Sequence, residues 1–98
     1  MYLLLAELRA KPSFASEVES ILRGLVEVAR TEAGTVRYAV HRQQENSDAF
    51  VVYELYRDAA ACKEHLALPP VKQALQRFEM LLSEPPRILF CDLVAMSN

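Results

Sequence analysis

The spacing of apolar and polar residues changes several times along this chain, and three stretches within its first 56 residues predict strands. Residues 2–9 are apolar at nearly every position, and the short run ends at Lys11-Pro12, which favours a strand over a helix. Apolar and polar side chains alternate over 35–43, as in a strand whose two faces differ. The run 49–56 is rich in β-branched and aromatic residues and predicts a partner strand, joined to 35–43 by the polar turn 44–48.

Helical spacing fills the intervals between the predicted strands. Apolar residues recur every three or four positions over about 14–33, with charged residues largely on the other side, which predicts an amphipathic helix. We expect Ser13 to cap the start of this helix and Gly34 to end it in a left-handed conformation. Asp58 is expected to cap a second, short helix at 59–67.

Two proline pairs divide the last third of the chain. Pro69-Pro70 ends the short helix, and Pro70 can open a further helix that Pro85-Pro86 ends. Residues 87–95 then predict a fourth strand. The order is β-α-β-β-α-β, with the second helical region split in two. This is the pattern of a ferredoxin-like α+β fold, a four-stranded antiparallel sheet with its helices on one face.

The length and the apolar content together predict a single domain that pairs with a second copy. The 98 residues suit one domain, 1–98, and 52% of them are apolar. The predicted strands carry apolar side chains on both faces, but the helices can cover only one of those faces. The other face would be a large exposed apolar patch, so we expect a homodimer formed sheet against sheet.

Charge and cysteine usage exclude several classes of partner. The formal net charge is −2, and the lysines and arginines are scattered, which argues against a nucleic-acid partner. Without a run of about 18 apolar residues, we expect no membrane span. The start of the chain does not read as a signal peptide, and Cys62 and Cys91 read as two reduced thiols, so a cytoplasmic protein is expected.

Two titratable residues are the main candidates for chemistry. His65, on the short helix, could act as a general acid or base, since an imidazole exchanges protons near neutral pH. It could equally be a structural histidine, bonded to the sheet edge or to solvent. Glu54 falls in a strand that should be buried, so its carboxyl must be paired or must serve as a base with a raised pKa. Arg9, Arg37 and Arg57 are its plausible structural partners.

Several further residues are candidates for binding a substrate. Period-two spacing places Tyr56 and Val52 on the same face as Glu54, where the Tyr56 hydroxyl could orient a substrate, although a core aromatic is the commoner outcome. Arg37 and His41 share one face of their strand and could bind an anionic group, or could simply be solvated. Phe78 is expected to be core or pocket wall. We expect no metal and no cofactor, because neither a cluster of ligands nor a glycine-rich phosphate loop occurs in the sequence.

The chain as a whole resembles the antibiotic-biosynthesis-monooxygenase superfamily of dimeric α+β-barrel proteins. The resemblance is carried by the segment leaving the first strand (6–12), by Glu32-Ala33-Gly34, and by the run from Phe50 to Asp58 with its Glu-x-aromatic ending. It is also carried by the histidine eleven residues after that glutamate, by Pro69-Pro70-Val71-Lys72 and by Glu84-Pro85-Pro86.

The resemblance implies several possible activities. Members oxidise quinols and polyphenols with O₂ and without metal or flavin, which is the function we expect here. The polyketide-oxidising members use an Asn and a Trp on the third strand, where this chain has Val52 and Tyr56. Other members isomerise a small phosphorylated hydroxydione, so a proton-transfer enzyme is the alternative. A dimer that binds a ligand without turnover is a third possibility.

Overall fold

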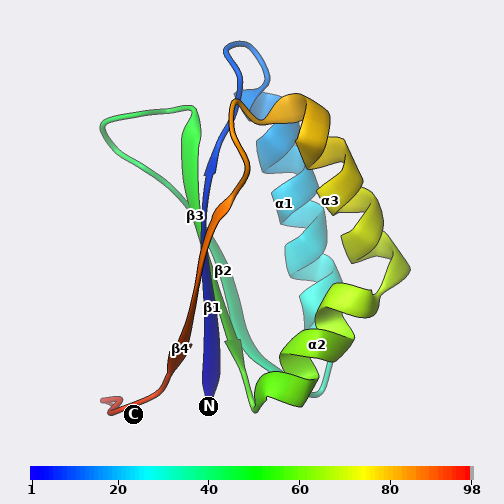
Figure 1. The fold of residues 1–98 in the computed structure, drawn as a ribbon, viewed down its shortest axis with the longest axis vertical. Coiled ribbons are helices and arrows are strands. Elements are labelled where there is room, and N and C mark those ends of the chain that lie inside the picture. Colours follow the sequence, from blue (N-terminus) through cyan, green and yellow to red (C-terminus); the bar gives the residue numbers. More distant parts are fainter. Residues whose placement is uncertain (98) are drawn as a thin grey trace.

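Residues 1–97 of the chain, described by a computed structural model, form a four-stranded antiparallel sheet with all three helices against one face (Figure 1). The strands are β1 (Tyr2–Arg9), β2 (Thr35–Arg42), β3 (Ala49–Tyr56) and β4 (Arg87–Asp92), and the helices are α1 (Ala15–Arg30), α2 (Ala59–Ala67) and α3 (Pro69–Leu81). The strand order across the sheet is β2-β3-β1-β4, which confirms the predicted ferredoxin-like α+β fold. Asn98, the last residue of the expected domain, lies outside the described residues.

The register of the strands decides which side chains face the helices. Glu54 on β3 lies between Tyr38 on β2 and Leu4 on β1, so these three side chains share the helix-covered face. The next row across the sheet holds Val40, Val52, Ala6 and Ile88. The alternate residues point to the opposite face, which no helix covers and which we call the open face (Figure 1). Its central row is Ala39, Tyr53, Leu5 and Leu89.

Helix α1 packs on the sheet through one apolar stripe. Val18, Leu22, Leu25 and Ala29 recur at intervals of three and four residues and are all buried, whereas the charged residues of α1 lie on its other side. Helix α3 adds Phe78 to the same core. The helices are therefore held by apolar side chains that pack against those of the inner sheet face. The candidate site lies within this layer.

The two helices after β3 begin as the sequence predicts. The Asp58 carboxylate accepts a hydrogen bond from the Ala61 amide at 2.8 Å and caps α2. Pro69 and Pro70 occupy the first turn of α3. The amides of this turn have no partner within the helix, so the missing amide proton of proline costs no hydrogen bond. The predicted bounds 59–67 match those of α2.

Helix α1 begins and ends differently from the prediction. Ser13 does not cap it: Ser13 has φ 75°, and Phe14 takes the capping position without a side-chain bond. Gly34 has no positive φ, and the helix ends at Arg30 rather than near residue 33. Thr31 supports this end, with its hydroxyl 2.7 Å from the Val28 carbonyl oxygen, to which it donates. The last strand likewise ends at Asp92 rather than at residue 95.

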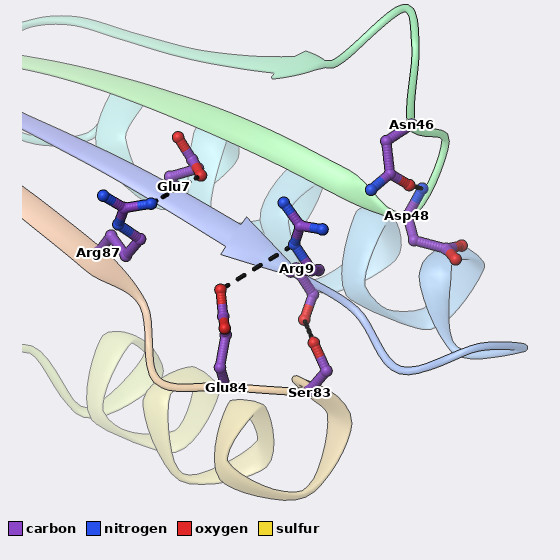
Figure 2. Close-up of polar contacts among 7 residues, drawn as sticks. All are labelled: Glu7, Arg9, Asn46, Asp48, Ser83, Glu84 and Arg87. Atoms are coloured by element: carbon purple, nitrogen blue, oxygen red, sulfur yellow. Dashed lines mark hydrogen bonds and ion pairs between the residues drawn. The ribbon is translucent and has the colours of Figure 1, made fainter.

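Polar contacts tie the connection between α3 and β4 to the end of β1 (Figure 2). The Ser83 amide and hydroxyl both donate to the Arg9 carbonyl oxygen, at 2.8 and 3.2 Å. The Arg9 guanidinium lies 4.0 Å from the Glu84 carboxylate, and Arg87 lies 4.0 Å from Glu7 across the β1–β4 ladder. This anchoring fixes the path of the chain into β4. Among residues 1–97, no helix is both long and apolar enough to cross a lipid bilayer.

Gly34 is required for close packing rather than for a left-handed turn. A Cβ atom on Gly34 would lie 2.6 Å from the Cβ of Ala61 on α2. We predict that Gly34→Ala lowers the free energy of unfolding by about 1–3 kcal/mol, because the backbone of α2 must move away. The matched control is Gly24→Ala, at an exposed position of α1 where no atom lies within 4 Å of the added Cβ. That change should stabilise by about 0.5–1 kcal/mol. Urea denaturation of both variants checks the pair, and equal effects would contradict the packing account.

Candidate active site

A largely apolar cavity of about 210 Å³ lies between the inner face of the sheet and the three helices. Its walls include Val52 on β3 and Phe78 on α3, both predicted to line a substrate site, and both almost fully buried. Three side chains with titratable groups line the same cavity: Tyr38, Glu54 and His65. Small-molecule sites are typically apolar hollows with a few polar groups at one place, and this cavity has that character.

Glu54 supplies the carboxyl group of the cavity. It is only 6% exposed, and the Tyr56 hydroxyl donates to its Oε1 at 2.5 Å. The Tyr38 hydroxyl, opposite on β2, also hydrogen-bonds it. Burial raises the pKa of Glu54 above its ordinary value, and the two phenols and the nearby His65 only partly offset this. Its partners are thus two tyrosines, and not Arg9, Arg37 or Arg57 as the structural alternative supposed.

His65 lies beside this carboxyl group and is 1% exposed. Its ring centroid is 5.5 Å from that of Tyr38 and 5.6 Å from that of Tyr56, so two aromatic rings of the sheet restrain it. Its Nδ1 atom lies 2.5 Å from Oε1 of Glu32, which follows α1 in the chain. The histidine is therefore bonded to a carboxylate, and not to the sheet edge or to solvent.

The phenols and the nearby thiol stay protonated in this environment. Burial and the neighbouring Glu54 raise the pKa of Tyr38 and of Tyr56 above the ordinary phenol value, so both remain hydrogen-bond donors. Burial and Glu54 also raise the pKa of Cys62 to about 11, so that its sulfur stays a thiol and a poor nucleophile near neutral pH.

The structure brings together most of the predicted site residues, but not all of them. His65, Glu54, Tyr56, Val52 and Phe78 surround or support the cavity. By contrast, Arg37 and His41 are exposed on the open face, where they lie opposite Leu55 and Val51. Binding of an anionic group by those two residues stays a prediction, and this cavity does not support it.

Sequence reasoning missed two members of the cluster. Tyr38 is not among the residues that the sequence marks as candidates, yet its hydroxyl meets Glu54 across the β2–β3 ladder. Glu32 was noted only as part of a family pattern, because nothing local connects it to a histidine 33 residues further on. The alternation of β2 could have identified Tyr38. It places Tyr38 and Val40 on the same face of the strand, and that face also carries their neighbours on β3, Glu54 and Val52.

A second hollow of about 680 Å³ adjoins the cavity on its outer side. Leu75, Phe78, Pro86 and Ile88 line both spaces, so the two hollows adjoin at these side chains. Leu75 and Ile88 are 43% and 47% exposed, as expected of side chains at a mouth that solvent reaches. The anchored connection between α3 and β4 shown in Figure 2 forms one side of this mouth.

The arrangement defines a class of chemistry rather than a substrate. It places a buried carboxyl group, two phenols and a carboxylate-bonded imidazole at one place in an apolar cavity, where a proton can be moved and an anion can be hydrogen-bonded. Within residues 1–97, no group of three or more His, Cys, Asp or Glu side chains is placed to hold a metal ion. The molecule is thus a ferredoxin-like α+β protein with an acid–imidazole site between sheet and helices.

Comparison with known proteins identifies the family of this chain. The family model described as antibiotic biosynthesis monooxygenase matches residues 1–77. The chain therefore belongs to the antibiotic biosynthesis monooxygenase family, in agreement with the resemblance carried by its motifs.

Individual relatives share the fold or part of the sequence. PA3566 from Pseudomonas aeruginosa is 31% identical, with a TM-score of 0.88 over 96% of this chain and 94% of that one. Rv0793 from Mycobacterium tuberculosis shares the fold at 20% identity, with a TM-score of 0.93 over 99% and 98% of the two chains. YcnE from Bacillus subtilis, whose name marks it as a candidate monooxygenase, is 28% identical over 95% of this chain and 98% of its own. The chain spans 55% of sll1783 from Synechocystis, at 24% identity over 83% of this chain.

The raised pKa of Glu54 predicts how stability changes with pH. A carboxyl group whose pKa is raised by folding favours the folded state in full below the unfolded value of about 4.3, and this contribution is lost as the pH rises through the folded value. Replacing Glu54 by Gln removes that dependence. We therefore predict that the free energy of unfolding of Glu54→Gln, relative to that of the wild type, rises as the pH is raised above the unfolded value and levels off above the folded pKa of Glu54.

Urea denaturation at fixed protein concentration across this pH range checks the prediction. Glu64→Gln is the matched control, because Glu64 is exposed on α2 beside His65 in sequence but does not line the cavity. A difference between Glu54→Gln and wild type that stays constant with pH would show that the carboxyl group is not perturbed by burial.

Proposed function

We propose that this protein is a monooxygenase that oxidises a small quinol or related polyphenol with O₂, without a metal or flavin. The observation that carries the proposal is the apolar cavity in which Glu54, Tyr38 and His65 meet. Membership of the antibiotic biosynthesis monooxygenase family and the resemblance to YcnE support the same class of reaction.

In such a reaction the substrate itself supplies the electrons. Loss of a proton from a quinol gives an electron-rich anion, which passes an electron to O₂. Recombination of the two radicals forms a carbon–oxygen bond, and the resulting hydroperoxide loses water to leave a carbonyl group. One oxygen atom enters the product and the other leaves as water, so one quinol and one O₂ give one hydroxyquinone and one H₂O. The protein has to move protons and shield the anion from water.

The residues of the cavity match these tasks. His65 takes the proton from the substrate hydroxyl and returns it to the departing oxygen atom. Glu54, which burial favours in its neutral form, donates its O–H to the oxygen atom on which the negative charge forms, and the Tyr56 hydroxyl holds the Glu54 carboxyl group in place. The side chains of Val52 and Phe78 form apolar walls that exclude water from the anion.

The size of the cavity restricts the substrate. A protein cavity of about 150 Å³ takes up benzene, so the 210 Å³ cavity here suits a ring with a few substituents. The adjoining hollow behind Leu75 and Ile88 gives room for the rest of a longer molecule. Quinols of one or two rings should therefore be better substrates than flat systems of three or four rings.

Oxygen uptake with a panel of quinols tests this function. We predict uptake of one O₂ for each quinol consumed by the wild type. Replacing His65 by Ala should lower kcat/KM by about 10²–10⁴-fold, the usual contribution of a general base. Glu54→Leu should lower kcat by a similar order, because a leucine side chain cannot donate a hydrogen bond to the anion. An oxygen electrode and product analysis by mass spectrometry measure both effects.

Exposed Glu64 on α2 again provides the control, and Glu64→Gln should keep the wild-type rate. Unchanged turnover in His65→Ala would remove His65 from the reaction. Conversion of a small hydroxydione without oxygen uptake would instead indicate the proton-transfer enzyme. Tight binding of quinols without any turnover would indicate a ligand-binding protein.

We also propose that the protein is a homodimer through the open face. That face presents Leu5, Tyr53 and Leu89 in one row, and Leu89 is 61% exposed. The adjoining row carries Leu3 and Cys91. Contiguous apolar surface of this kind typically marks an interface, and a second copy would bring the same apolar row to it.

Light scattering combined with gel filtration tests the dimer. We predict a mass of two chains for the wild type at micromolar concentration and of one chain for Leu5→Glu, because a carboxylate in the centre of an isologous face meets its own copy. The control is Met80→Glu, a similar change at a residue that is 76% exposed on α3. A wild-type mass of one folded chain would contradict the proposal.

A further inference from the structure

Glu32 is held firmly although it lies outside any helix or strand. It follows the end of α1, and its amide donates to the Ala29 carbonyl oxygen at 3.1 Å. Its own carbonyl oxygen accepts from the Thr35 amide at 3.3 Å, at the start of β2. With both backbone groups bonded, the side chain is directed from a fixed position. The Glu32 side chain is 16% exposed, so its carboxylate contacts His65 and reaches solvent as well.

The imidazole that Glu32 contacts has little freedom to turn. His65 is 1% exposed, and the rings of Tyr38 and Tyr56 lie beside it at interplanar angles of 46° and 48°. Its Nδ1 atom is the ring nitrogen at the carboxylate, 2.5 Å from Oε1. Because Nδ1 and Nε2 lie on opposite sides of an imidazole ring, this contact directs Nε2 away from Glu32.

We infer that Glu32 is a positioning residue that fixes the tautomer of His65, a role that rests on the proposed function for its chemical purpose. The carboxylate accepts a hydrogen bond from Nδ1–H, so the neutral ring carries its free lone pair on Nε2. Nε2 is then the atom that takes the substrate proton, and the carboxylate stabilises the imidazolium that forms. Without this partner, the imidazole would have to leave the competing Nε2–H tautomer and adopt the Nδ1–H tautomer at every turnover.

The other groups around His65 do not replace Glu32 in this role. Tyr38 and Tyr56 direct their hydroxyl protons to Glu54 and contact His65 through their rings, whereas Nδ1 lies at the Glu32 carboxylate. Cys62, on the same helix, remains a thiol and is a weak acceptor. Glu54 already accepts from two phenols. Among these neighbours Glu32 is thus the carboxylate whose contact with Nδ1 selects the tautomer.

Nitrogen NMR of the protein labelled with ¹⁵N-histidine tests the inference without any substrate. The chain has two histidines, and His41, exposed on the open face, is an internal reference in every spectrum. We expect His65 to show the Nδ1–H tautomer in the wild type at a pH where the ring is neutral. In Glu32→Leu the Nε2–H tautomer should become the major form, and the signals of His41 should not change.

Two results would overturn the inference: the Nε2–H tautomer in the wild type, or an Nδ1–H tautomer that persists in Glu32→Leu. If Glu32→Leu does not fold, Glu32→Asp serves instead, because its shorter side chain cannot reach Nδ1 from the same backbone position. Glu27→Leu, at an exposed carboxylate of α1 paired with Arg30, is the matched control and should leave the tautomer as in the wild type.

A kinetic measurement separates this inference from the proposed function. With an active quinol, Glu32→Leu should lower kcat roughly tenfold or more while KM changes less, as expected when a partner of the base is lost. If the tautomer changes as predicted but the wild type shows no oxygen uptake, then Glu32 positions His65 and the proposed reaction is wrong. If uptake is present but the tautomer does not change, the role of Glu32 is wrong and the reaction stands.

Discussion

A carboxyl group in the middle of an apolar sheet face is costly unless hydrogen bonds satisfy it, and this constraint organises the structure around Glu54. The residue lies in β3, one of the two central strands, on the face that the helices cover. Tyr38 and Tyr56 meet the demand with their hydroxyl groups. Their positions follow from sheet geometry, since one lies directly across the ladder and the other lies two residues along the same strand.

The remaining parts of the site depend on that arrangement. The two tyrosine rings whose hydroxyls satisfy Glu54 also lie beside His65, which ties helix α2 to the sheet. Gly34 allows α2 to approach β2 closely enough for this contact, because its missing side chain leaves room for Ala61. The apolar residues around the cluster give the cavity a low polarity, which strengthens each of its hydrogen bonds. The same packing that stabilises the fold therefore prepares the site for proton transfer.

Most of the fold was predictable, because local signals agree with one another along this chain. The run of β-branched and aromatic residues at 49–56, the Asp58 cap and the Pro69-Pro70 pair each gave element bounds that match the structure. The failures occurred where a residue type has more than one use. Gly34 suggested a left-handed end to α1, but its purpose is a contact with a helix that begins 25 residues later. Ser13 suggested a cap, but its backbone adopts a turn conformation instead.

The candidate site was predictable only in part, for the same physical reason. Glu54 and His65 could be identified because a carboxyl group in a strand and an imidazole on a helix are chemically conspicuous. Their partners could not, since the contact between His65 and Glu32 depends on how α2 lies on the sheet. Alternation correctly put Arg37 and His41 on one face of β2, but it does not tell which face the helices cover. The structure resolves this by placing both on the open face.

The state of the Glu54 carboxyl group is the central claim, and infrared difference spectroscopy over a pH titration measures it directly. The absorption of a protonated carboxyl group that is missing from Glu54→Gln reports this residue alone. The account predicts that this absorption persists in the wild type to a pH above 4.5, the ordinary glutamate value, and disappears at a higher midpoint. A midpoint at or below that value would mean that Glu54 is an ordinary anion at neutral pH, and the hydrogen-bonding role assigned to it would then fail.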